Sequence, residues 1–338
     1  MMTITRHFRT LSCLLLLGAL AAACSRPGSG ADPTDTPPGE QMAATTPIAS
    51  DGQSSDEPAD TDPNDPQQAQ LQQPGAGSLL PHTRVISYYG HPSTPTMGVL
   101  GSGTMEEVYA RLQQQVAEWQ AVDPNTPIKP AFEIIATVAQ PEPGPEGTYL
   151  LYTGDEWIGE YVDFATAHNM LVILDLQIGH NSIENEINRV RHWLALPNVH
   201  VALDPEFSTK ANDIPRPDRV PGELIGEISG YQVMTAVEML SQIVAENNIP
   251  NKILIVHQFE EEMIYEKHVV ETRPGVDIVV DVDGFGAPET KIGGYQEYVT
   301  NELIQYGGLK LFYEQDVPLL DPATMLTLNP PPSVVIYQ

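Results

Sequence analysis

Short apolar runs alternate with amphipathic segments from about residue 82 to the end of the chain. The runs have the length and β-branched content of buried strands, and the segments between them carry apolar residues at helical spacing. Two capping-box patterns, Thr104-x-x-Glu107 and Thr153-x-x-Glu156, predict the first turns of two helices. The predicted strands cover 85–89, 131–138, 170–176, 199–207, 252–257, 276–282, 309–313 and 333–337. The first predicted helix begins after residue 104, and the others cover 153–169, 182–196, a segment carrying Val233 to Val244, 260–270, 289–306 and 322–326.

Eight strands, each except the last followed by a helix, predict a (β/α)8 TIM-type barrel that lacks a C-terminal eighth helix. A doubly wound open sheet is the main alternative. Gly101-Ser-Gly103 lacks the third glycine of the dinucleotide fingerprint G-x-G-x-x-G, and the sequence contains no Walker motif. These absences favour the barrel over the nucleotide-binding sheet.

The first eighty residues have a different pattern. Arg6 and Arg9 precede an apolar run over 11–23, and the small residues before Cys24 resemble a bacterial lipobox. We therefore expect a lipoprotein signal peptide over 1–23 and a lipid on Cys24 that anchors the exported protein to the extracytoplasmic face of a bacterial membrane. An ordinary secretory peptide is the alternative. Residues 24–81 are rich in Pro, Gln, Ala and Asp, which predicts a disordered acidic tether before a barrel domain over 82–338.

The charge of the predicted barrel domain narrows the choice of partners. The chain has 45 acidic and 16 basic residues; removing nine acids in the tether and three N-terminal arginines leaves 36 against 13, a formal charge of about −23. Such a surface disfavours nucleic acid and anionic lipid as partners. It suits a neutral or cationic small molecule or polysaccharide, and solvation of the protein in salty surroundings is an equally open explanation. We expect a monomer.

Acidic, aromatic and histidine residues gather at the C-terminal ends of the predicted strands, where barrel enzymes place their active sites. Period-two alternation puts Asp204 and Glu206 on one face of their strand, as it does Asp281 and Asp283. We expect these polar faces to line the barrel interior and mouth. The candidate binding or supporting residues are Tyr88, Tyr89, His91, Asp175, Gln177, Asp204, His257, Phe259, Asp281 and Asp283.

The positions of two glutamates resemble those of retaining glycoside hydrolases with a (β/α)8 fold. In that group the acid/base Glu follows strand four and the nucleophile Glu follows strand seven, places that Glu206 and Glu314 hold in this chain. The resemblance implies a two-carboxylate mechanism with Glu206 protonated and Asp204 helping to raise its pKa. Pro205 stands where the group usually has Asn, and Asp204-x-Glu206 is also similar to the D-x-E of some lysozymes and chitinases. The tyrosines and Phe259 are candidate stacking faces for sugar rings.

Two other functions remain open from the residues. Asp175, Asp204, Glu206, His257 and Asp281 form an oxygen-rich set that suits a divalent metal, which would make the protein a metal-dependent hydrolase, although no complete metal motif is present. A barrel without catalysis that binds solute or cell wall is the third possibility. No other cofactor is indicated.

Several segments together resemble a group of uncharacterised exported bacterial lipoproteins. They are Tyr89-Gly-His-Pro92, Leu203-Asp-Pro-Glu206, His257-Gln-Phe259, Asp281-Val-Asp-Gly-Phe-Gly286 and Lys310-Leu-Phe-Tyr-Glu-Gln-Asp316. The resemblance covers most of the predicted barrel domain, but it implies no activity.

Overall fold

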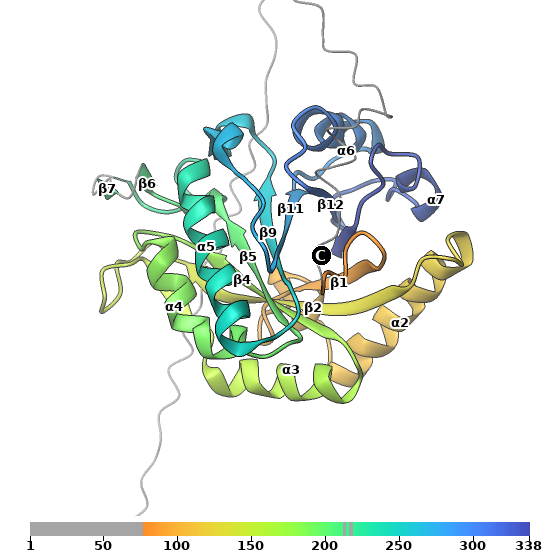
Figure 1. Cartoon of the computed structure of the whole chain (residues 1–338), viewed down its shortest axis with the longest axis horizontal. Coiled ribbons are helices and arrows are strands. Elements are labelled where there is room, and N and C mark those ends of the chain that lie inside the picture. Colours follow the sequence, from red (N-terminus) through yellow and green to blue (C-terminus); the bar gives the residue numbers. More distant parts are fainter. Residues whose placement is uncertain (1–76, 212–213, 216–218) are drawn as a thin grey trace, which may run out of the picture. The chain divides into compact units, whose positions relative to one another are not determined.

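A computed structural model of the protein describes residues 77–211, 214–215 and 219–338. Eight parallel strands close into a barrel, because β1 pairs with β2 on one side and with β13 on the other (Figure 1). In order around the barrel they are β1 (Arg84–Gly90), β2 (Ile128–Ala139), β4 (Leu171–Gln177), β5 (Val199–Asp204), β9 (Lys252–Gln258), β11 (Val276–Val282), β12 (Tyr306–Leu311) and β13 (Val334–Tyr337).

Helices cover the outside of the barrel (Figure 1). A short strand, β3 (Leu150–Tyr152), pairs antiparallel with the end of β2. The helices are α2 (Met105–Val122), α3 (Asp155–Ala167), α4 (Ile183–Leu194), α5 (Gly230–Asn247), α6 (Pro288–Tyr295), continued by a π-helical turn (Gln296–Thr300), and α7 (Pro322–Met325). The remaining short strands are β6 (Lys210–Ala211), β7 (Ile214–Pro215), β8 (Ile228–Ser229) and β10 (Ile264–Tyr265).

This architecture confirms the (β/α)8 barrel and excludes the open sheet. The β1–β13 ladder pairs Val85 with Val334 and Tyr88 with Tyr337, so the sheet has no free edge where an open sheet would end. All eight predicted strands are present. Among the described residues no helix follows β13.

Alternation along the strands separates two apolar layers. One face of each strand packs against the helices, and the other face fills the barrel, where Val85, Ile173, Ile255 and Ile336 belong to the interior core. Because the apolar interior residues come from the earlier positions in most strands, the later inward positions remain for polar side chains. The sequence-based assignment of an inward polar face is therefore confirmed.

One predicted helix start is wrong. At Thr104 both hydrogen bonds of the capping box are present, but α3 is preceded by Gly154, whose position makes no side-chain cap. The hydroxyl of Thr153 instead donates to the carbonyl of Ile135 in β2, at 2.7 Å. Thr153 therefore joins the loop before α3 to the barrel and does not cap the helix.

Two predicted helices are also shorter than expected. Residues 260–270 form two 3-10 turns and β10, because Glu266 has a left-handed backbone conformation (φ 54°) that interrupts a helix. The helix predicted over 289–306 ends at Thr300, and β12 begins at Tyr306, three residues before the predicted strand.

The signal peptide, Cys24 and most of the predicted tether lie outside the described residues. Within the part of the chain that the structure describes, no helix is both long and apolar enough to span a membrane.

We predict that replacing Trp119 of α2 with Phe destabilises the barrel. The indole is fully buried, its Nε1–H donates to the hydroxyl of Tyr337 in β13 at 2.9 Å, and the guanidinium of Arg84 lies 5.0 Å from its centroid. Loss of this bond and of packing volume should cost about 1–3 kcal/mol in the free energy of unfolding, measured by chemical denaturation. Trp157 is 47% exposed, so Trp157→Phe is the matched control with an expected change under about 0.5 kcal/mol. Equal effects of the two substitutions would contradict this account.

Candidate functional site

The end of β5 turns sharply and presents Glu206 at the mouth of the barrel. Pro205 begins a 3-10 turn (Pro205–Phe207), and the Oδ1 of Asp204 accepts the backbone N–H of Glu206 at 3.0 Å. The carbonyl of Glu206 accepts the N–H of Gly226, where any Cβ would lie 2.4 Å from the carbonyl oxygen of Pro205. The turn is therefore fixed from both sides, and Glu206 is left half-buried.

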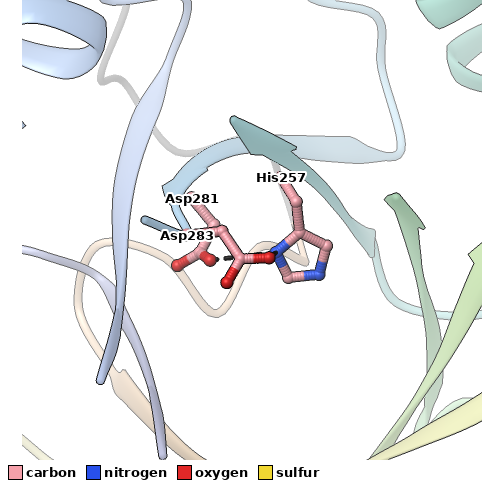
Figure 2. Close-up of side chains that lie close together, drawn as sticks. All are labelled: His257, Asp281 and Asp283. Carbon is pink, nitrogen blue, oxygen red and sulfur yellow. Dashed lines mark hydrogen bonds and ion pairs between the residues drawn. The ribbon is translucent and has the colours of Figure 1, made fainter. Parts of the chain in front are cut away.

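His257 of β9 is the centre of the polar interior. Its Nδ1 lies 3.0 Å from Asp281 Oδ2 and 3.5 Å from Asp283 Oδ2, and Figure 2 shows both aspartates on that side of the ring. Its Nε2 lies 3.2 Å from Glu133 Oε1 and 3.8 Å from Asp175 Oδ1. Carboxyl groups therefore face the imidazole at both nitrogens, and all of these residues are buried.

A second cation joins this group from β12. The Nζ of Lys310 lies 3.1 Å from Asp283 Oδ1 and 3.7 Å from the ring centroid of Tyr89. The hydroxyl of Tyr89 in turn donates to Asp175 Oδ2 at 2.8 Å. We call the set Tyr89, Glu133, Asp175, Asp204, Glu206, His257, Asp281, Asp283 and Lys310 the interior cluster.

The interior cluster shifts the protonation of its members. Burial, reinforced by the charge of Asp204, raises the pKa of Glu206 to about 8, and burial with the charges of Asp204 and Glu133 raises the pKa of Asp175 to about 8. Burial also raises the pKa values of Glu133 and Asp204.

The pKa values of the two cations of the interior cluster are raised as well, which favours their charged forms. Burial alone would lower the pKa of His257, but Asp283, Asp281 and Glu133 outweigh it and hold that pKa well above its usual range. In the same way, burial is outweighed at Lys310 by the surrounding carboxylates, with Asp283 first, and the pKa of its ammonium is raised. The barrel thus contains protonated carboxyls beside stabilised cations.

Seven of the residues singled out from the sequence meet in this cluster. The strand-end residues Tyr89, Asp175, Asp204, Glu206, His257, Asp281 and Asp283 come from five strands and the loops that follow them. Tyr89 is only 4% exposed, so it acts as a hydrogen-bond donor inside the barrel and offers no open face to a sugar ring.

Glu314 does not reach the interior cluster. β12 ends at Leu311, and the chain then turns, because Asp316 Oδ2 accepts the N–H of Phe312 at 2.9 Å. Glu314 is exposed on this turn, and no described residue gives it a hydrogen bond or ion pair. The inward position of the strand that precedes it belongs to Lys310.

Four other candidates also lie apart from the interior cluster. Tyr88 points outward, opposite to Tyr89, and is buried against Tyr313 and Tyr337. Gln177 accepts the N–H of Ala139 and so holds the end of β2. Tyr88 is too buried for the expected stacking role, and Phe259 is partly buried against the outer core. His91 contacts Ser93 and Thr94 in its own loop.

Two members of the cluster were not among the candidate site residues chosen from the sequence. Glu133 lies within the apolar run of β2, where it shares the inward face with Ala131 and Ile135. The signal that the sequence offered for Glu133 was one acidic residue at an inward-facing position of an otherwise apolar strand. Lys310 shares the inward parity of its strand, but its contact with Asp283 depends on barrel geometry.

Three side chains of the interior cluster have the arrangement of metal ligands. His257, Asp281 and Asp283 each offer one ligand atom, and these atoms lie within 4.8 Å of one another. Imidazole with two carboxylates suits a first-row divalent ion. Asp204 and Glu206 stand outside this set.

The matches to known proteins come from solved structures. No protein-family model matches the chain. No curated protein gives a significant sequence match. Among solved structures, the chain is similar to the noncanonic maltogenic α-amylase AmyB from Thermotoga neapolitana, at 12% identity and a TM-score of 0.23, over 68% of this chain and 46% of the amylase chain. The chain therefore spans less than half of that enzyme, and conclusions about activity rest on the side chains of the barrel.

We predict that Asp204→Asn lowers the pKa of Glu206 below about 8. The substitution removes the neighbouring charge that, after burial, contributes most to the raised value, and the amide oxygen still accepts the Glu206 N–H. The measurement is an NMR titration of the ¹³C-labelled Glu206 carboxyl. Glu314→Gln is the control, with no expected change, because Glu314 has no contact with Glu206 among the described residues. An unchanged Glu206 pKa in Asp204→Asn would contradict the account.

Proposed function

We propose that the protein is a glycoside hydrolase in which Glu206 is the general acid. One observation carries this proposal: a half-buried carboxyl at the C-terminal mouth of a (β/α)8 barrel has a pKa raised to about 8. Such a group keeps its proton at neutral pH and can deliver it to a glycosidic oxygen as the bond breaks. The position after the fourth barrel strand supports the same role.

Asp204 supports the acid in two ways. Its hydrogen bond to the Glu206 N–H orients the turn, and its negative charge disfavours ionisation of Glu206. A carboxylate that is itself buried, 4% exposed, acts through a low-dielectric surrounding and is weakly screened by salt. The neighbouring pair therefore keeps the proton on Glu206 until the substrate takes it.

Two carboxylates compete for the second role of the mechanism, as nucleophile or stabiliser. Glu314 follows the seventh barrel strand, as the resemblance to retaining hydrolases requires, and it is exposed, but it lies outside the interior cluster. Asp283 is buried, and its charge contributes to the raised pKa of Glu206. Substitution of each in turn separates them.

The substrate we propose is a neutral or cationic carbohydrate. Six carboxyl side chains of the interior cluster face only two cations, and the domain around them is strongly acidic. Phe285, 66% exposed after β11, and Tyr313, 39% exposed after β12, offer the aromatic faces that the buried tyrosines of β1 do not. We also propose that a lipid on Cys24 tethers this hydrolase to the outer face of a membrane.

We predict that Glu206→Gln lowers turnover by about 10²- to 10⁴-fold, because the amide cannot donate a proton to the leaving oxygen. The measurement is release of reducing sugar from a panel of polysaccharides that includes chitin and cationic chitosan. For the wild-type protein, turnover should fall as pH rises through about 8, where Glu206 loses its proton. Full turnover in Glu206→Gln would contradict the assignment.

The second carboxylate is identified by the same assay on Glu314→Gln and Asp283→Asn. We predict a loss of at least about tenfold in one of them and restoration by azide, which replaces a missing carboxylate nucleophile, in that variant alone. Glu289→Gln, in the first turn of α6, is the control for a surface glutamate near the same loops. If both variants and the control are fully active, the two-carboxylate mechanism is wrong.

A further inference from the structure

On the Nδ1 side of His257, one carboxylate oxygen of the interior cluster is left without a hydrogen-bond partner among the described residues. Asp281 is completely buried, and its Oδ2 lies against His257 Nδ1 at 3.0 Å. Its Oδ1 has no hydrogen-bond partner in the described part of the chain. A buried carboxylate oxygen in this state is costly unless a cation or donor compensates it.

The other side of the imidazole shows the same feature. Both oxygens of Glu133 and the Oδ1 of Asp175 lack a hydrogen-bond partner among the described residues, although Glu133 Oε1 lies 3.2 Å from His257 Nε2. A ring N–H aimed at Glu133 would complete the pair.

A glycine leaves room beside the unpartnered oxygen of Asp281. Gly308 of β12 pairs with Asp281 of β11, and a Cβ at this glycine would lie 2.7 Å from Asp281 Oδ1. The same Cβ would lie 3.0 Å from Val279 Cγ1. The absence of a side chain at position 308 therefore preserves space next to the carboxylate.

We propose that His257 Nδ1, Asp281 and Asp283 bind one first-row divalent cation, with Mn²⁺ as the representative ion, at this position inside the barrel. The three residues place ligand atoms within 4.8 Å of one another, and Figure 2 shows the two aspartates facing the same ring nitrogen. One imidazole and two carboxylates favour Mn²⁺ over Mg²⁺, because Mn²⁺ accepts a nitrogen ligand more readily than Mg²⁺ does.

The remaining groups fit the surroundings of such a cation. Binding of the cation at Nδ1 would displace the proton from that nitrogen, so the cation would replace the positive charge of the imidazolium. His257 Nε2 would keep its proton and donate to Glu133, the carboxylate–histidine–metal arrangement that orients metal-binding imidazoles. Lys310 contacts Asp283 at 3.1 Å, so the ion and the ammonium share that carboxylate, while Asp281 serves the ion alone. This site does not include Glu206, whose proposed role requires no metal, but it shares Asp283 with the candidates for the second carboxylate.

The test measures Mn²⁺ binding to the chelator-treated, full-length protein by electron paramagnetic resonance. Mg²⁺ is present in millimolar excess to suppress weak binding of Mn²⁺ at the surface. We expect about one bound Mn²⁺ per chain and at least about tenfold weaker binding in Asp281→Asn. Asp277→Asn is the matched control: it lies on the same strand, but its carboxylate contacts Ser78 and Asn251 and should leave Mn²⁺ binding unchanged.

A second variant keeps every charge in place. Gly308→Ala fills the space beside Asp281 Oδ1 and should also weaken Mn²⁺ binding, so the test does not depend on the folding of Asp281→Asn. Absence of tight Mn²⁺ in the wild-type protein, or equal binding by Asp281→Asn and Asp277→Asn, would overturn the proposal. Glu206→Gln should bind Mn²⁺ as the wild type does, so loss of hydrolysis and loss of metal are read separately.

Discussion

Closure of the barrel buries carboxyl groups from several strands next to one another. The stability of the structure depends on how their negative charge is compensated. Glu133, Asp175 and Asp281 are fully buried, and each would be unstable there as an isolated anion. His257 and Lys310 supply the positive charge, and raised carboxyl pKa values supply protons. The interior cluster is therefore stable only as a group, because the charge of each member is compensated by several of the others.

The same balance gives the site its chemistry. Glu206 stands at the edge of the interior cluster, half-buried and next to Asp204, so it holds a proton while remaining close to the mouth. Deeper in the barrel, His257 faces carboxyls at both ring nitrogens, which is the arrangement of the proposed cation site. One buried network can thus supply a proton donor at its rim and a cation site at its centre.

The sequence was sufficient for the barrel and for much of the cluster, because strand periodicity fixes which side chains face inward. Asp175, Asp204 and Asp281 were found in this way. Glu133 was missed because it lies within an apolar run rather than at a strand end, and only closure brings it to His257. Glu314 was placed beside Glu206 because the seventh strand was predicted to end at residue 313, two residues after the observed end of β12 at Leu311. The turn held by Asp316 is a tertiary contact that periodicity does not reveal.

The most direct test of this charge balance is the free energy of unfolding of Lys310→Met, measured against the wild-type protein at pH 4 and pH 8 with chelator present. At pH 8 the account predicts a loss of about 3–5 kcal/mol, because a buried carboxylate loses its partner. Removing the ammonium raises carboxyl pKa values further in the folded state, so stability falls as pH rises and the deficit shrinks at pH 4. An equal deficit at both pH values would contradict the account.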